Sequence, residues 1–363
     1  MITRAIRRAI KKLWYNEKIL APRVRYAQRD IKTKISKINI SPVNEEQRSK
    51  IFNFWSEYPI DIKLDYKWFD FFNTIHPNNN NIEYFIPHDL FYGYIDTQLS
   101  DPIKAKYFDD KNLYDLIFHD IPQPKTIVRK ENGIILDEKY NIINIEQAIT
   151  KCSNADKLII KPSVESEGGS GIKFWDKSKD CVSQLREILT DDGRYIVQEL
   201  AKQSEILNQI HKDSLNTIRI ISLVFGDKTI VLSNVLRMGV NGNKVDNAAS
   251  GGIFCGINAD GKLKEVAFNS LGEKFTHHPQ GGELSNFTIP NINKCTELVK
   301  TCAPRIQHIS KLCSWDIYID DNDNPALIEV NMTFGDVQLH QLTNGPIFGE
   351  LTPDILSYIF KKK

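Results

Sequence analysis

The sequence lacks the patterns that mark several common protein classes. Its six cysteines form no CxxC pair, so neither a zinc knuckle nor a disulfide framework is expected, and reduced thiols in a cytoplasmic protein are favoured. No apolar run reaches the roughly 18 to 20 residues that a transmembrane helix needs, and the N-terminus shows no signal-peptide stretch. No GxxxxGK(S/T) phosphate-binding loop or internal repeat occurs. These absences predict a cytoplasmic globular protein without a P-loop.

The composition indicates a soluble protein of two or three lobes, since 41% of its 363 residues are hydrophobic and 26% are charged. The net charge of +1 conceals a basic segment, because residues 1–38 hold twelve Lys or Arg and only two acids. Two placements of this segment stay open: peripheral contact with the inner face of a membrane, or docking on the rest of the protein. Nucleic-acid binding is not expected, because no reading motif follows. The apolar residues that recur here at helical spacing are Ile2, Ile6, Ile10, Leu13 and Trp14.

The pattern of residue types along the chain changes near Lys106. Residues 41–106 are rich in aromatic side chains and predict a small helical lobe that leads into an extended stretch at 84–87. From 107 to 355 short apolar strands alternate with helical stretches and glycine turns, which is typical of an α+β domain. We therefore predict three parts, 1–40, 41–106 and 107–355, the last divided after residue 200. The aromatics expected in the core of the lobe are Phe52, Phe54, Trp55, Trp68, Phe69, Phe71 and Phe72.

Apolar runs and helical periodicity locate the elements of the α+β domain. Helices are expected near 111–119, 180–190 and 294–310. The expected strands are 158–161, 171–175, 195–199, 217–225, 229–239, 315–320 and 326–331.

The most informative stretch runs from Trp315 to Asn331, where two alternating strands flank a turn-forming run, Asp321 to Asn324. A four-residue turn places Asp316 directly opposite Glu329, with Cβ atoms roughly 5 Å apart. Alternation predicts Leu327, Glu329 and Asn331 on one side of the hairpin. Two adjacent carboxylates repel each other unless a cation lies between them, and two acids with an amide are ligands that Mg²⁺ prefers beside phosphates. The alternative is a hairpin with a solvent-facing acidic side.

A second motif ends an apolar strand with Lys161 and continues into a glycine- and serine-rich loop, Glu165 to Gly171. A lysine at a strand end can reach a phosphate, and backbone N–H groups of a small flexible loop can close over phosphates. Taken alone, such a turn is more often a plain hairpin than a lid.

Two further motifs lie between these. The strand 195–199 runs into a polar connection that contains Glu205, where strand-end backbone groups can read an adenine edge and a carboxylate can take ribose hydroxyls. Arg219 and Arg237 interrupt apolar strands and so require anionic partners, either a substrate phosphate or carboxylate or a buried salt bridge.

Taken in order, these motifs resemble the ATP-grasp superfamily, in particular its sugar-transfer-associated branch, over roughly residues 84 to 350. The resemblance implies an α+β ATP-grasp fold, in which two subdomains grip ATP, preceded by the small helical lobe. It implies ATP and Mg²⁺ as cofactors, with Asp316, Glu329 and Asn331 as metal ligands. Arg219, Arg237 and Lys161 become candidate catalytic residues. The implied nucleotide contacts are Lys111, Lys161, Glu167, Gly168, Gly169, Ser170, Gly171, Gln198, Glu199, Leu200, Glu205 and Asn216; Lys125 competes with Lys111 for the first phosphate lysine.

The family's chemistry implies an ADP-forming ligase that joins a carboxylate to an amine through an acylphosphate. The partners expected from the resemblance are a carboxylate-bearing saccharide acceptor, such as a uronic acid of a surface polysaccharide, and an amine donor. A kinase or ligase of free small metabolites, and an inactive nucleotide-binding scaffold in a glycan-assembly complex, remain alternatives. Among the eight histidines, His340 lies just beyond the metal strand and merits testing first.

Overall fold

A computed structural model describes residues 13–59, 64–164, 169–244, 246 and 251–360. Of the apolar residues at helical spacing in the basic segment, Ile2, Ile6 and Ile10 lie outside these residues, whereas Leu13 and Trp14 are described and are 60% and 55% exposed. The described chain continues through a π-helical turn, η1 (Asn16–Leu20), into the helix α2 (Ala21–Ile35). Within the described part of the chain, no helix is long and apolar enough to cross a membrane.

The first sheet is antiparallel throughout and has the strand order β3-β2-β1-β6-β4-β5. The helices α9 (Ile145–Ser153) and α10 (Val182–Thr190) pack on one face and enclose a small core. Ile160 and Val197 point into this core, so their neighbours Lys161 and Gln198 point to the opposite face. The strands are β1 (Thr126–Glu131), β2 (Ile134–Asp137), β3 (Ile142–Ile143), β4 (Lys157–Pro162), β5 (Lys173–Asp176) and β6 (Tyr195–Glu199).

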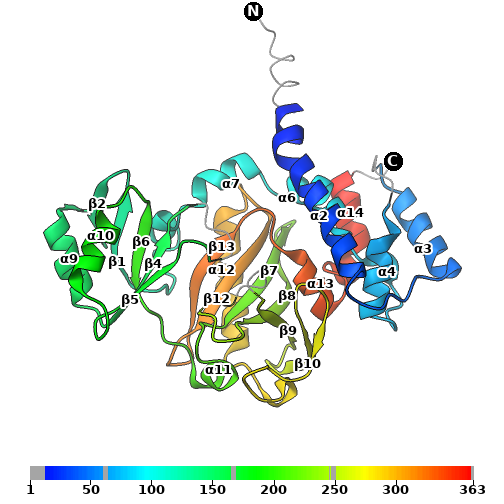
Figure 1. Cartoon of the computed structure of the whole chain (residues 1–363). Coiled ribbons are helices and arrows are strands. Elements are labelled where there is room, and N and C mark those ends of the chain that lie inside the picture. Colours follow the sequence, from blue (N-terminus) through cyan, green and yellow to red (C-terminus); the bar gives the residue numbers. More distant parts are fainter. Residues whose placement is uncertain (1–12, 60–63, 165–168, 245, 247–250, 361–363) are drawn as a thin grey trace, which may run out of the picture.

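The second sheet forms the centre of the molecule, with the order β11-β10-β9-β8-β7-β12-β13 (Figure 1). One face is covered by α12 (Ile292–Ile306) and α11 (Glu205–Ile210). All eight residues of β12 are buried because this strand lies inside the sheet and both faces of the sheet are covered. The strands are β7 (Thr217–Phe225), β8 (Lys228–Met238), β9 (Ile253–Ile257), β10 (Leu263–Phe268), β11 (Lys274–Phe275), β12 (Leu312–Ile319) and β13 (Pro325–Asn331).

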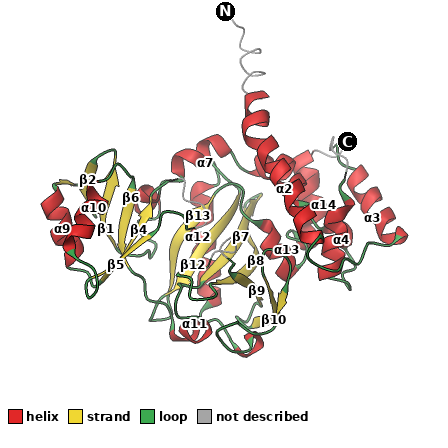
Figure 2. Cartoon of the chain, viewed as in Figure 1, coloured by secondary structure: helices red, strands yellow, loops and turns green. Residues whose placement is uncertain are grey.

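The aromatic segment forms the expected helical lobe, built on α3 (Glu45–Ser56) and α4 (Tyr66–Ile75). Trp68, Phe69, Phe71 and Phe72 are fully buried, whereas Phe52 is 61% exposed. The lobe shares one hydrophobic core with strands β7 and β8 of the second sheet, so it covers that sheet's other face together with α13 (Val337–Asn344) and α14 (Thr352–Phe360) (Figure 2). The remaining short elements are η2 (Ile82–Tyr84), α5 (His88–Leu90), η3 (Phe91–Ile95), α6 (Asp96–Leu99), α7 (Pro102–Phe108), η4 (Lys111–Leu113), α8 (Tyr114–Ile117), η6 (Leu284–Asn286) and η7 (Gly349–Leu351).

The expected strands all occur within a few residues of their predicted bounds, since each is a largely apolar or alternating run. The stretch 84–87 differs, because Tyr84 closes a 3-10 turn before the chain becomes extended at Phe85. The sequence interpretation also missed β1 to β3 and β9 to β11. The predicted division into three parts remains a prediction, and the shared core of the lobe and the second sheet bears on it most directly.

Candidate active site

The hairpin of β12 and β13 places Asp316 opposite Glu329, as the sequence predicts. The route to that pairing differs from the expected four-residue turn. Ile319 pairs with Pro325, and at that register Asp316 would face Ile328. A β-bulge between Leu327 and Glu329 inserts one extra residue and restores the pairing of the two acids.

The bulge also changes which side chains share a face. We expected Leu327 beside Glu329 and Asn331, and this is wrong, because Leu327 and Val330 lie in the same hydrophobic core. The extra residue reverses the alternation of the strand at this point. Glu329 and Asn331, two residues apart beyond the bulge, keep one common side and are partly exposed.

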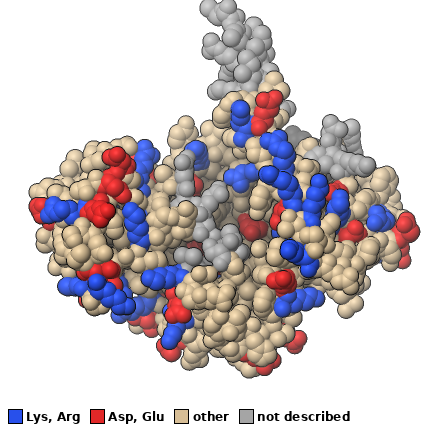
Figure 3. Space-filling model, viewed as in Figure 1, with Lys and Arg blue, Asp and Glu red and all other residues tan. Residues whose placement is uncertain are grey.

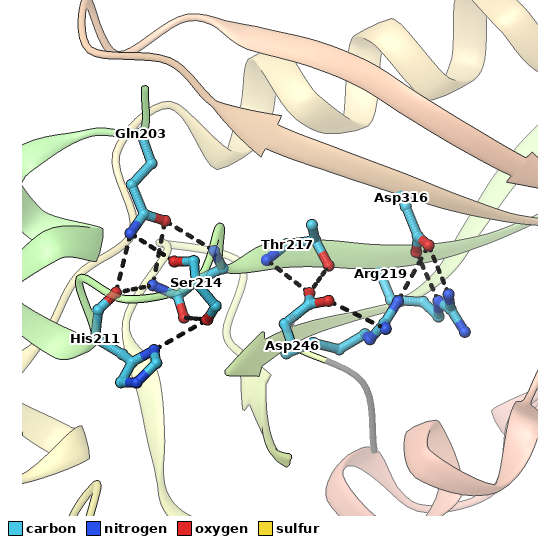
Figure 4. A network of polar contacts seen from close by, with 9 residues as sticks. Gln203, His211, Ser214, Thr217, Arg219, Asp246 and Asp316 are labelled. Carbon is cyan, nitrogen blue, oxygen red and sulfur yellow. Dashed lines mark hydrogen bonds and ion pairs between the residues drawn. The ribbon is translucent and has the colours of Figure 1, made fainter. Parts of the chain in front are cut away.

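Asp316 is held by two arginines from the neighbouring strands (Figure 4). Arg219 donates from Nε to Oδ1 at 2.7 Å and from Nη2 to Oδ2 at 2.6 Å, and Arg237 donates from Nη1 to Oδ2 at 3.1 Å. Burial raises the pKa of Asp316, but the two guanidinium groups outweigh it and lower the pKa to about 2. The buried salt bridge, one of the two alternatives for these arginines, is therefore present, and the arginines relieve the repulsion between Asp316 and Glu329 that we had assigned to a metal ion.

The arginine cluster extends to Asp246, in the loop after β8. Arg237 Nη2 lies 3.3 Å from Asp246 Oδ1, and Thr217 donates to Asp246 Oδ2 from both its backbone N–H and its hydroxyl. Sequence reasoning grouped the loop that begins at Asp246 with Arg219 and Arg237 but assigned Asp246 no role, because an acid in a loop carries no periodic signal. Its contacts tie the loop to the first residues of β7.

Two lysines, Lys111 in η4 and Lys161 near the end of β4, lie close to Glu329 of the second sheet. Lys111 Nζ lies 3.4 Å from Glu329 Oε1, and the backbone N–H of Lys111 donates to the carbonyl of Ser163 at 2.9 Å. Lys161 donates to Gln198 Oε1 at 3.1 Å. Burial lowers the pKa of Lys161 to about 8, against the opposing effect of the Glu329 carboxylate. Lys111, Lys161 and Glu329 therefore lie close together, although they come from different parts of the fold.

Lys125, the competing phosphate lysine, lies elsewhere. Its side chain is 70% exposed and pairs with Glu199 at 2.5 Å. Both residues line a cavity of about 440 Å³ together with Thr126, Lys151 and Glu138. Of the two lysines, Lys111 is the one beside Glu329.

The other residues expected to contact the nucleotide differ in position and in burial. Glu167 and Gly168 lie outside the described residues, while Gly169, Ser170 and Gly171 form a turn before β5, in which both glycines have positive φ. Gln198 is buried at the end of β6, whereas Glu199 and Leu200 are partly exposed. Glu205 begins α11, directly after Ser204, whose N–H donates to the carbonyl of Ile319 at 3.0 Å.

Asn216, expected at the nucleotide, is fully buried in a structural network. Its Nδ2 donates to the carbonyls of His211 at 2.7 Å and Leu207 at 3.0 Å, and its backbone N–H donates to Gln203 Oε1 at 2.8 Å. Figure 4 shows this network at the opposite end of the view from the Arg219–Asp316 pair. These contacts support a role in anchoring the loop before β7.

His340 is fully buried, and its Nδ1 lies 2.7 Å from Ser233 Oγ. Burial and the nearby Arg219 hold its pKa well below the usual range. The ring is therefore neutral, and a buried neutral imidazole packed behind the arginine pair supports positioning rather than proton transfer.

The donor set suits a nucleotide-bound magnesium ion. Among the described residues, no three His, Cys, Asp or Glu side chains converge as a complete protein cage for a metal. Mg²⁺ commonly takes one or two carboxylates and completes its shell with phosphates and water. Glu329 and Asn331 fit that pattern, and Asp316 retains less capacity because three hydrogen bonds already reach its oxygens.

Comparison with known proteins identifies the family of the chain. Residues 94–353 match the model of the sugar-transfer associated ATP-grasp family, and the chain therefore belongs to that family. The two antiparallel sheets with helices and an N-terminal helical region confirm the expected α+β ATP-grasp fold. No curated protein sequence matches the chain.

Several solved structures are similar in fold at low identity. D-alanyl-alanine synthetase A from Vibrio cholerae is 14% identical (TM-score 0.37), with 70% of this chain and 61% of that chain covered. D-alanine–D-alanine ligase from Bacillus anthracis is 15% identical (TM-score 0.38; 76% and 69% covered). The ATP-grasp ligase PsnB is 14% identical (TM-score 0.41; 70% and 62% covered). The chain thus spans about six to seven tenths of the length of these three.

Proposed function

We propose that this protein is an ATP- and Mg²⁺-dependent ligase that activates a carboxylate as an acylphosphate and joins it to an amine with formation of a C–N bond. The observation that carries the proposal is that Lys111 of η4 and Lys161 of β4 lie close to Glu329 of the second sheet. Buried lysines opposite an acid suit a triphosphate and its cation. Membership of the ATP-grasp family supports the same reading.

The proposed role of each residue follows from its charge and its position. Lys111 and Lys161 bind phosphate oxygens, and backbone N–H groups of the turn Gly169 to Gly171 close over them. Gln198, Glu199 and Leu200 border the adenine, and Glu205 lies toward the ribose. Glu329 and Asn331, with Asp316, hold the magnesium ion, which neutralises phosphate charge when bound. Arg219 and Arg237 offset the negative charge of Asp316 beside the reacting groups.

Catalysis on this proposal needs no protein nucleophile. The γ-phosphoryl group passes from ATP to a carboxylate oxygen and ADP leaves. The amine nitrogen then attacks the acyl carbon, the C–N bond forms, the C–O bond to phosphate breaks, and the amine releases a proton. Positioning and electrostatic stabilisation by the lysines account for most of the acceleration.

The finer substrate assignment is a saccharide carboxylate, such as a uronic acid of a polysaccharide or its precursor, joined to an amine such as an amino acid. The family description, which associates these domains with sugar transfer, supports this part of the proposal. A peripheral membrane contact through residues 1–38 would suit a lipid-linked acceptor. Co-sedimentation with anionic vesicles, compared with a variant carrying Gln at Arg4, Arg7 and Arg8, tests that contact.

The central experiment incubates the purified protein with ATP, Mg²⁺, glucuronate and each amino acid in turn, and measures ADP release and product mass. We expect ADP release that requires both carboxylate and amine, with loss in Lys161→Gln and retention in Lys300→Gln, a surface lysine of α12 paired with Glu297. ADP formed with a phosphorylated product and no amine requirement would identify a kinase instead. Absence of ADP release and of nucleotide binding in the wild type would refute the ligase.

A further inference from the structure

The loop between β2 and β3 has an unusual residue at its most constrained position. The N–H of Asp137 donates to the carbonyl of Asn141 at 2.9 Å and closes a three-residue loop, which Tyr140 ends with a φ of 64°. Hairpin loops of this length normally place glycine at such a left-handed position, because a side chain there is strained. The neighbouring turn between β1 and β2 follows that preference with Asn132 and Gly133. Tyr140 therefore occupies its position at a conformational cost, and such strain concentrates at functional sites.

The Tyr140 side chain reaches the segment that carries Lys111. Its hydroxyl donates to the carbonyl of Asn112 at 2.7 Å and also lies within hydrogen-bonding distance of Asp115 Oδ1. Both acceptors lie in η4 and α8, directly after Lys111. Burial first, and then the nearby Asp115, raise the pKa of Tyr140, so the hydroxyl keeps the proton that it donates. The contact therefore joins the loop to a segment 28 positions earlier in the chain.

A buried arginine holds the tyrosine ring in place. The Arg129 guanidinium lies 4.2 Å from the centroid of the Tyr140 ring, and its Nη1 donates to the carbonyl of Asp137 at 3.0 Å. Its Nη2 forms an ion pair with Asp115. Arg129 is 1% exposed, so its charge is compensated by these protein groups rather than by solvent. The ring, the loop and Asp115 are thereby fixed to strand β1.

The same segment contacts the strand that carries the proposed metal ligands. Lys111 Nζ lies 3.4 Å from Glu329 Oε1, and the Tyr114 hydroxyl donates to the carbonyl of Val330 at 3.3 Å. The backbone N–H of Lys111 donates to the carbonyl of Ser163, the residue after β4, at 2.9 Å. The segment formed by η4 and α8 therefore lies between the first sheet and β13.

Attraction of an anion does not by itself require this anchor. Lys and Arg side chains gather beside the central hollow of the molecule, so the positive potential there does not depend on the placement of one lysine (Figure 3). A hydrogen bond from Lys111 to a phosphate oxygen, in contrast, depends on where the backbone of η4 lies. An anchored η4 presents the ammonium group before the ligand arrives, which lowers the ordering cost of binding. The anchor therefore acts on nucleotide affinity through geometry.

We propose that Tyr140 is a positioning residue, whose hydroxyl anchors η4 so that Lys111 meets the phosphate groups of the nucleotide. The phosphate contact of Lys111 rests on the ligase function proposed above, whereas the anchor itself does not. The proposal accounts for a tyrosine at a loop position that favours glycine, because its ring packs on Arg129 while its hydroxyl reaches the Asn112 carbonyl.

The first test measures the Kd of MgADP by titration calorimetry on the full chain. Tyr140→Phe removes the hydroxyl and keeps the ring over Arg129, so the fold should persist, which circular dichroism checks. The matched control is Tyr195→Phe, which removes a hydroxyl of the same sheet that donates to Asp191 Oδ2 at 2.9 Å. Lys111→Gln and the double variant Tyr140→Phe/Lys111→Gln complete a double-mutant cycle.

We expect the Kd to rise about fivefold in Tyr140→Phe and to stay unchanged in Tyr195→Phe. Adding Tyr140→Phe to Lys111→Gln should cause no further rise, because the anchor acts through Lys111. A structural role unconnected with Lys111 would weaken binding equally whether or not Lys111 is present. Additive effects in the cycle, or an unchanged Kd in Tyr140→Phe, would therefore overturn the positioning role.

A second test needs no nucleotide. Hydrogen–deuterium exchange followed by mass spectrometry reports on the N–H of Lys111, which is bonded to the Ser163 carbonyl. We expect residues 109–115 to exchange faster in Tyr140→Phe than in the wild type and in Tyr195→Phe, and equal exchange would overturn the anchor. Faster exchange in Tyr140→Phe with no MgADP binding by the wild type would refute the nucleotide site and leave the anchor standing. An active ligase with equal exchange would do the reverse.

Discussion

Arg219 on β7 holds Asp316 on β12 with both edges of its guanidinium, at 2.7 and 2.6 Å. The two residues are register partners across adjacent strands, so the backbone ladder brings them together before any ligand does. The pair is buried, and Arg237 completes it from the next strand. The two acids of the hairpin consequently have different surroundings, and their substitution should have different effects.

Asp316→Asn should destabilise the fold as well as the activity. The change leaves two buried guanidinium groups without their counter-charge, and breaking a buried ion pair from one side typically costs about 3 to 5 kcal/mol. Denaturant unfolding followed by circular dichroism measures the free energy of unfolding. A variant as stable as the wild type would contradict the structural role assigned to Asp316.

Glu329→Gln should spare the fold. Glu329 contacts Lys111 at 3.4 Å with a side chain that is 23% exposed, and Gln keeps its size and one acceptor oxygen, so the free energy of unfolding should change little. Turnover should nevertheless fall by roughly 10²- to 10³-fold, because the proposed metal ligand is lost. Comparison of unfolding curves and ADP release with Glu265→Gln, an exposed acid on β10, separates the two effects; loss of stability without loss of turnover would reverse the assignment.

Nucleotide affinity should depend on pH through Lys161. Burial lowers the pKa of this lysine to about 8, so its charge is present below pH 8 and is lost as the pH rises above it. The Kd for MgADP should then rise by up to about tenfold per pH unit between pH 8 and 10. Lys161→Arg stays charged over this range and should show a flatter profile by calorimetry. Parallel profiles for the two proteins would exclude Lys161 as the titrating group.

Stability should fall as the pH rises toward neutrality because of Asp96. Burial raises the pKa of its carboxyl to about 7, against an ordinary value of 3.8. Between these values the folded state holds a proton that the unfolded state has released, so the stabilising effect of protonation is present at low pH and is lost as the pH rises through 7. Asp96→Asn cannot ionise and can still accept the Phe334 N–H, so it should exceed the wild type at pH 8 by on the order of 2 to 4 kcal/mol.

That difference should shrink below pH 6, and thermal melts at pH 5, 6, 7 and 8 measure it. Asp89, whose pKa burial raises to about 6, contributes the same trend to both proteins and cancels in the comparison. A pH-independent gap would show that Asp96 does not titrate in this range. Asp354→Asn, at an exposed acid in the first turn of α14, serves as the surface control.

Residue pattern predicted much of the candidate site. Strand alternation and turn composition identified the hairpin, and the pairing of Asp316 with Glu329 is confirmed. The bulge was beyond prediction, because an inserted residue leaves the apolar pattern of Leu327 to Val330 plausible in either register. Lys111 and Lys125 were equally eligible from spacing, and only the fold shows which of them lies beside Glu329.

By itself the sequence determined the local elements and the family, because apolar periodicity and the order of short motifs are properties of neighbouring residues. The tertiary structure decided which charges meet. Arg219 and Asp316 are 97 positions apart, and Lys111 and Glu329 also lie far apart in the sequence. The surroundings then set the state of each group, because burial keeps His88 neutral, whereas Arg219 and Arg237 keep Asp316 ionised against the effect of its burial. Both effects depend on the packing of elements distant in sequence.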